Sequence, residues 1–153
     1  MLMAKKAKQN EAQEYLLQVQ KLDSSIDSRL EQVAHLKAMT TKITTTLKQD
    51  VVSGSGNQDK IGDAIAKIID LENEINRDID AYVDKKREIC KVIEAVKDPD
   101  QMVVLQKRYL LYESWEQIAL EMHCTYRNVC YIHGRALQAV TELMKGKEYG
   151  SKE

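Results

Sequence analysis

Two long stretches of this chain place apolar residues at alternating steps of three and four positions. In the first, from about residue 9 to 49, Arg29 and Thr40 occupy the positions of the repeat that are not apolar. In the second, from 61 to 96, Glu72 and Lys86 interrupt the repeat, and Leu71 lies beside the first interruption. This heptad spacing predicts long α-helices that pack along a seam. The predicted seam residues are Val19, Leu22, Ile26, Val33, Leu36, Ile43 and Leu47, followed by Ile61, Ile65, Ile68, Ile75, Ile79, Tyr82, Ile89, Ile93 and Val96.

The two stretches are separated by a segment that disfavours helix. Residues 51–58 include two glycines and two serines, and a second break comes at Pro99. Each helix would reach about 50 to 60 Å, and their similar lengths on either side of a flexible joint predict a long antiparallel, coiled-coil-like helical hairpin. A single hairpin buries only one seam, so we expect its second apolar flank to be covered by the C-terminal segment or by another chain. The hairpin is therefore the predicted site of homo-oligomerisation.

Composition favours an all-α fold class. Six glycines and one proline are too few turn formers for an all-β sandwich or barrel. The longest apolar runs are a few residues long, whereas a membrane span needs roughly 20. The N-terminus has no apolar core of a secretory signal, and the three cysteines form no CxxC pair. We expect reduced thiols, no membrane partner and a cytoplasmic location.

Charge is distributed unevenly along the chain. Residues 10–100 carry 13 basic and 18 acidic side chains, whereas residues 101–147 carry 6 basic and 4 acidic ones. An acidic helical body joined to a mildly basic module is typical of a protein with one end that faces nucleic acid. The predicted organisation is a basic, solvated tail over 1–9, the helical hairpin over 10–97, a C-terminal domain over 98–146 and a short tail over 147–153.

The C-terminal domain shows the spacing of a helix-turn-helix. Ser114 and Gln117 form a capping-box pattern, which predicts a helix from Trp115, and Thr125 predicts the cap of a second helix from Tyr126. In a window that starts at Trp115, such a motif needs five apolar positions and one small position where the helices cross. His123 falls where these turns need positive φ. The six packing positions are Ile118, Met122, Cys124, Val129 and Ile132, with Ala119 at the crossing.

These residues resemble region four of bacterial sigma factors, the part that reads promoters. The similarity lies in the runs QKRYLL at 106–111, SWEQIA at 114–119 and TYRNVCYIHGRAL at 125–137. The arrangement as a whole is similar to small proteins of phages and prophages, related in form to the ArpU and RinA groups of late-transcription regulators. The resemblance implies a phage-type, sequence-specific transcription regulator in the bacterial cytoplasm. Its implied partners are double-stranded DNA and host RNA polymerase. This sequence lacks the other sigma regions, so we do not expect a complete sigma factor.

The outward face of the second helix carries the candidate contacts with DNA. With Thr125 as the cap, we expect Val129, Ile132, Ala136 and Leu137 to point inward. Arg127 could bind guanine and Asn128 adenine in the major groove, while the other polar residues could contact phosphate or a thymine methyl group. The predicted DNA-binding residues are Thr125, Tyr126, Arg127, Asn128, Tyr131, Arg135 and Lys107.

Other functions fit the sequence less well. His123, Cys124, Cys130 and His133 lie close together, but they show no CxxC or HxxxH spacing, so we predict no metal site and no cofactor. No pattern of nucleophile and base is evident, and we expect no enzyme activity. Two alternatives stay open, a phage DNA-packaging recognition subunit similar to a small terminase, and a helical protein-binding adaptor.

Overall fold

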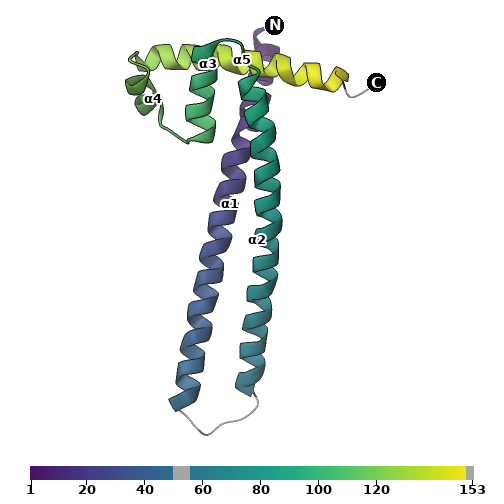
Figure 1. The fold of residues 1–153 in the computed structure, drawn as a ribbon, viewed down its shortest axis with the longest axis vertical. Helices are drawn as coiled ribbons and strands as arrows, with labels where there is room; N and C mark the ends of the chain where they lie inside the picture. The colour runs from purple at the N-terminus through teal and green to yellow at the C-terminus, as the bar shows by residue number, and fades with distance from the viewer. Residues whose placement is uncertain (50–55, 151–153) are drawn as a thin grey trace. The chain divides into compact units, whose positions relative to one another are not determined.

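The computed structural model describes residues 1–49 and 56–150, and it is all-α (Figure 1). No strand occurs among these residues, as the composition predicts. None of the helices in these two ranges is both long enough and apolar enough to cross a membrane. The elements are helices α1 (Leu2–Gln49), α2 (Gly56–Glu94) and α3 (Pro99–Leu105), a π-helical turn η1 (Gln106–Leu110), and helices α4 (Trp115–Glu121) and α5 (Tyr126–Gly150).

The chain forms two compact units whose boundaries differ from the predicted domains. Residues 22–82 form the hairpin unit, and residues 1–21 together with the chain from 83 onward form the C-terminal unit. Residues 2–9 are helical, because α1 begins at Leu2, and the Gln9 side-chain amide donates a hydrogen bond to the Gly134 carbonyl of α5 at 3.3 Å. Ala12 and Leu16, both buried, extend the apolar spacing of α1 toward this end.

In the hairpin unit, the two helices run antiparallel. The Arg29 guanidinium contacts the Glu74 carboxylate at 3.1 Å, and the Lys37 ammonium, further along α1, contacts the Glu72 carboxylate, earlier on α2, at 2.7 Å. The predicted antiparallel pairing is therefore confirmed for this unit. Its buried core is formed by Ile26, Val33, Ile68 and Ile75, with Leu36, Leu71 and Tyr82 packed against it. The side chain of Leu47, another predicted seam residue, lies outside the described residues.

The predicted seam of α2 is wrong at two of its positions. Ile65 is 46% exposed and Ile79 is 40% exposed, so neither is buried against α1. The structure instead turns Leu71 toward the core and places Asp78 where its carboxylate contacts Arg29 at 3.0 Å. An α-helix rich in apolar residues carries two overlapping repeats of three and four, and the repeat that packs against α1 includes Leu71 and Asp78. The sequence analysis selected the other repeat.

After the end of α2, the C-terminal unit continues with a capped helix, α3. The Asp98 carboxylate accepts hydrogen bonds from the backbone amides of Asp100 at 2.9 Å and Gln101 at 3.2 Å, and Pro99 occupies the first helical position. Helices α3 and α4 both pack on α5. Leu111, the residue that follows η1, is 63% exposed.

Candidate nucleic-acid interface

Helix α4 begins where its sequence predicts. The Ser114 hydroxyl accepts a hydrogen bond from the Gln117 amide at 3.2 Å, which satisfies one of the free N–H groups at the helix start. The other half of the capping box does not form, because the Gln117 side chain donates instead to the Glu121 carboxylate at 2.6 Å. The single cap is enough to set the first residue of α4 at Trp115.

The turn after α4 has the geometry that a helix-turn-helix requires. His123 adopts φ of 52°, the left-handed conformation predicted for this position. The Cys124 amide donates to the Ala119 carbonyl at 3.0 Å, which closes the turn. The Thr125 hydroxyl then accepts from the Asn128 amide at 3.1 Å, and α5 begins at Tyr126. Both predicted caps are thus confirmed.

The six predicted packing positions lie in one hydrophobic cluster. Ala119 is buried between the helices, so the small side chain allows α4 and α5 to approach closely. Because the core fixes α5 against α4 and α3, the outward face of α5 has a fixed direction within this unit. The cluster contains buried Val104, Ile118, Ala119 and Val129, with Trp115, Met122, Cys124 and Ile132 packed against it.

The first turns of α5 present a polar and aromatic face to solvent. Tyr126 is 50% exposed and Tyr131 is 62% exposed. The Arg135 guanidinium lies 5.7 Å from the centre of the Tyr131 ring and donates to its hydroxyl at 3.4 Å, so this pair is held together on the helix surface. The exposed residues of this face are Thr125, Tyr126, Arg127, Asn128, Tyr131 and Arg135, and we call them the α5 face.

Lys107 does not join the α5 face. Its ammonium contacts the Glu113 carboxylate at 3.5 Å and also the Glu121 carboxylate of α4. The hydrogen bond with Glu121 raises the pKa of Lys107, and the same bond lowers the pKa of Glu121. With both partners charged and paired, Lys107 ties η1 to α4, which differs from the phosphate contact that the sequence analysis assigned to it.

Tyr109 and His133, which the sequence analysis did not join, form a buried polar pair behind the α5 face, and the partly buried Trp115 packs against this pair. The Tyr109 hydroxyl and His133 Nε2 lie 2.7 Å apart, and the Trp115 ring packs edge-on against the His133 ring with 4.6 Å between centroids. Burial lowers the pKa of His133 to about 4, with a further contribution from the Arg108 charge, and burial raises the pKa of Tyr109 to about 12. At neutral pH both side chains are therefore uncharged. Their role is to hold α5 against η1.

This buried histidine predicts that acid destabilises the C-terminal unit. In the unfolded chain His133 binds a proton below its ordinary pKa of 6.5, whereas the folded state resists protonation until about pH 4. The contribution of neutral His133 to the free energy of unfolding is therefore fully present above pH 6.5. It is lost as the pH falls from 6.5 to 4, and the loss is about 3 kcal/mol at most. Urea unfolding at pH 7 and pH 4.5 measures the loss. The His133→Gln variant should show a smaller loss between these two pH values, and an unchanged loss would contradict the assignment.

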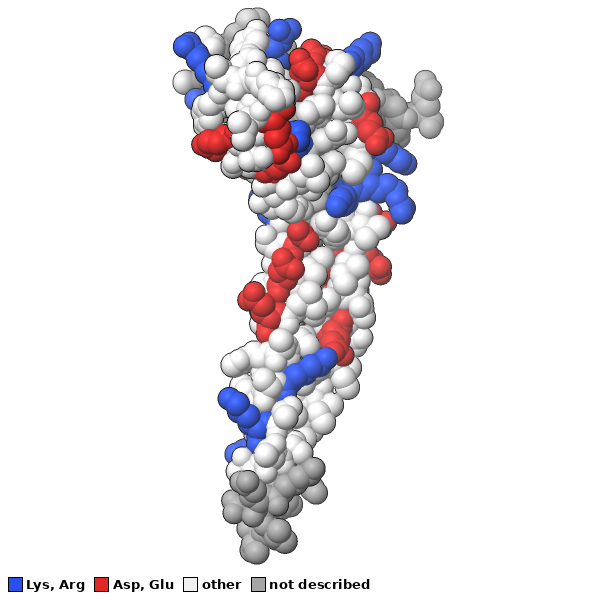
Figure 2. Space-filling model, turned by 60° about the vertical axis from the view of Figure 1, so that its left-hand side comes forward, with Lys and Arg blue, Asp and Glu red and all other residues white. Residues whose placement is uncertain are grey.

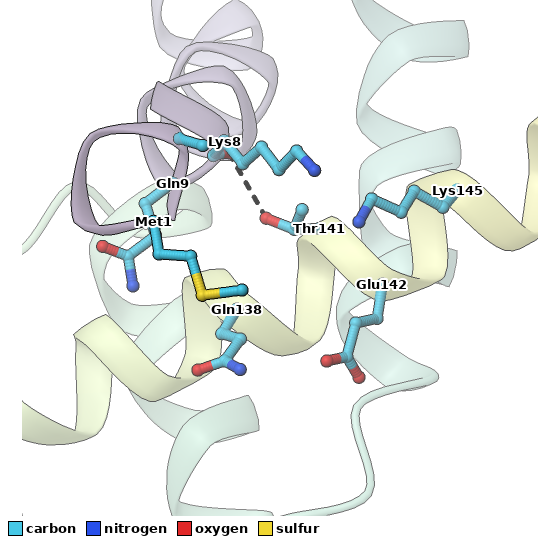
Figure 3. A pocket seen from close by; sticks show the side chains of 8 residues that line it. Met1, Lys8, Gln9, Gln138, Thr141, Glu142 and Lys145 are labelled. Carbon is cyan, nitrogen blue, oxygen red and sulfur yellow. Dashed lines mark hydrogen bonds between the residues drawn. The ribbon is translucent and has the colours of Figure 1, made fainter. Parts of the chain in front are cut away.

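A pocket also lies between the start of α1 and the middle of α5 (Figure 3). Its volume is about 330 Å³, and the Thr141 hydroxyl donates to the Lys8 carbonyl at 3.3 Å across it. Two lysines and one glutamate line it among amide and apolar side chains, with no histidine or cysteine. Within the described ranges no three metal-ligating side chains come together. The α5 face is therefore the stronger candidate site. The lining residues are Met1, Ala4, Lys8, Gln9, Gln138, Thr141, Glu142 and Lys145.

Comparison with known proteins gives one family. A family model described as "Protein of unknown function (DUF1492)" matches residues 41–143. The match runs from the end of α1 through α2 and the helix-turn-helix to α5, and it covers more than half of the chain. The curated proteins and the solved structures give no match.

Proposed function

The chain belongs to the DUF1492 family, and we propose that it is a phage-type, sequence-specific DNA-binding transcription regulator. It reads double-stranded DNA with the α5 face, in the cytoplasm of a bacterial host. The observation that carries this proposal is the exposed set of Arg, Asn and Tyr side chains on the first turns of the second helix of a capped helix-turn-helix. In DNA-binding proteins of this kind, that part of the second helix enters the major groove.

The α5 face offers groups for base readout. Arg127 is exposed in the first turn and can donate two parallel hydrogen bonds to guanine O6 and N7. Asn128 is its exposed neighbour and matches the donor and acceptor pair on adenine. Within residues 1–49 and 56–150 neither side chain makes a hydrogen bond or an ion pair, so DNA would not have to displace a partner.

Other groups of the same face suit the phosphate backbone. The hydroxyls of Thr125 and Tyr131 and the guanidinium of Arg135 lie beside the N-terminal turns of α5. Helix N-termini and arginines favour phosphate. Figure 2 shows basic and acidic side chains intermixed on the visible face of the molecule, without a broad basic surface. Electrostatic attraction alone would be weak at physiological salt, so we propose that a second copy or host RNA polymerase adds affinity, as the resemblance to sigma region four suggests.

The proposal is tested by asking which fragments of its source genome the purified protein retains at about 150 mM salt. The matched control is the double variant Arg127→Ala/Tyr131→Ala, in which both changes lie on exposed positions and leave the core intact. Retention of one fragment beside a promoter, lost in the variant, is the expected result. Retention of a fragment beside packaging genes would support the packaging alternative, and no retention at all would favour a protein-binding adaptor.

A further inference from the structure

The hairpin unit exposes a second row of apolar residues on α2, apart from its buried core. Ile65, Ile69 and Ile79 are 46%, 51% and 40% exposed. Together with Glu72 and Asn76 they occupy positions 65, 69, 72, 76 and 79. These positions are separated alternately by four and three residues, so their side chains lie on one face of the helix. We call this row the α2 stripe. It is a heptad seam that α1 of the same chain does not cover.

The α1 side of this face adds one more apolar residue. Glu72 of the stripe contacts the Lys37 ammonium, which places Lys37 at the edge of the stripe. Leu30 lies seven residues before Lys37, two helical turns away on the same side of α1, and is 48% exposed. The flank of the stripe that faces away from α1 carries Ala66, Asn73 and Asp80, which are seven residues apart and all exposed. Only Asp80 among them is charged, and the small side chain of Ala66 permits another helix to approach closely.

The α2 stripe is symmetric about residue 74. Reversing the direction of the helix about this point exchanges Ile69 with Ile79 and Glu72 with Asn76. In the sequence it also exchanges Ile65 with position 83, which is valine. An interface between two identical copies related by a two-fold axis requires this kind of self-complementary surface.

We propose that the α2 stripe binds the same stripe of a second copy of this chain, with the two α2 helices antiparallel and the two-fold axis near residue 74. Ile69 of one copy then packs against Ile79 of the other. The Asn76 amide of one copy donates to the Glu72 carboxylate of the other copy. That Glu72 keeps its contact with Lys37 of its own chain. The two-fold axis repeats this contact, so two polar pairs lie at the centre of the apolar seam and fix its register, as a central asparagine does in coiled coils.

The stripe lies outside α4 and α5, so this inference stands or falls separately from DNA binding. Sedimentation velocity of the wild-type chain should show a dimer. The Ile69→Glu/Ile79→Glu variant should raise the dimer dissociation constant by at least about 30-fold, since it places charges in the centre of the seam. Met39→Glu is the matched control, because Met39 is 47% exposed and lies about 160° around α1 from Lys37. A monomeric wild type, or equal dissociation constants for the stripe variant and the wild type, would overturn the proposal.

Disulfide trapping tests the direction of the pairing and does not depend on disruptive charges. The variants Ile69→Cys and Ile79→Cys, each with exposed Cys130 replaced by serine, are oxidised alone and as a mixture. Antiparallel pairing predicts a covalent heterodimer in the mixture and little covalent dimer in either variant alone. Efficient cross-linking of Ile69→Cys with itself would show parallel pairing and overturn the proposed register.

Discussion

Replacing Ile118 with aspartate is expected to unfold the C-terminal unit. Ile118 is fully buried in the cluster that joins α3, α4 and α5. The substitution removes apolar packing worth about 2 to 5 kcal/mol and places a carboxylate in a hydrophobic cluster, which costs several kcal/mol more. Domains of this size are stable by only about 5 to 15 kcal/mol, so the loss is comparable with the whole free energy of unfolding.

Trp115 reports this result directly, because it is the single tryptophan of the chain and packs against the same cluster. We expect its emission to shift to the red in Ile118→Asp, while the circular dichroism signal falls to the share of the hairpin unit, which holds less than half of the described helical residues. Leu120→Asp is the matched control, since Leu120 lies on the same helix but is 70% exposed. Its stability should change by no more than about 0.5 kcal/mol. Similar spectra for both variants would show that α4 is not packed as described.

Replacing Arg127 with alanine is expected to weaken binding to the retained DNA fragment by about 1 to 3 kcal/mol. This corresponds to about 5- to 150-fold in the dissociation constant. Arg127 is exposed and makes no contact with the core, so the fold and the thermal unfolding midpoint should not change. Fluorescence anisotropy with the retained fragment and with a random duplex of equal length measures both affinities, and only the first should fall.

Arg135→Ala provides the comparison for this prediction. Arg135 is exposed two turns further along α5, beside Tyr131, and we expect it to contact phosphate. Its loss should weaken binding to the two duplexes by the same factor and lower the salt dependence by about one phosphate contact. If Arg127→Ala also weakened both duplexes equally, Arg127 would contact only the backbone, and the source of specificity would have to lie elsewhere on α5.

The local features of the C-terminal unit could be predicted from sequence because short-range chemistry determines them. Ser114 and Thr125 cap their helices, and His123 takes up positive φ, through groups that lie within a few residues. The heptads likewise predict the antiparallel hairpin, since apolar spacing reflects the face that a long helix buries.

Features that depend on distant contacts could not be predicted in this way. Ile65 and Ile79 fit a seam by spacing, but the choice between two overlapping repeats depends on which face of α2 packs against α1. Lys107 is an exposed cation by sequence, and only the fold brings the Glu121 carboxylate to it. The contact of Gln9 with Gly134 joins residues 125 positions apart. Sequence patterns carry little information on such pairs.

Photo-cross-linking from position 131 tests most directly whether the α5 face lies on DNA. A photoreactive phenylalanine analogue would replace Tyr131, which is 62% exposed, and the labelled retained fragment would be irradiated with it. The control places the same group at Lys91, an exposed position on α2. We expect a covalent complex from position 131 that excess unlabelled fragment abolishes, and little from position 91. Equal yields from both positions, or none from position 131 while the fragment is bound, would contradict the proposed role of the α5 face.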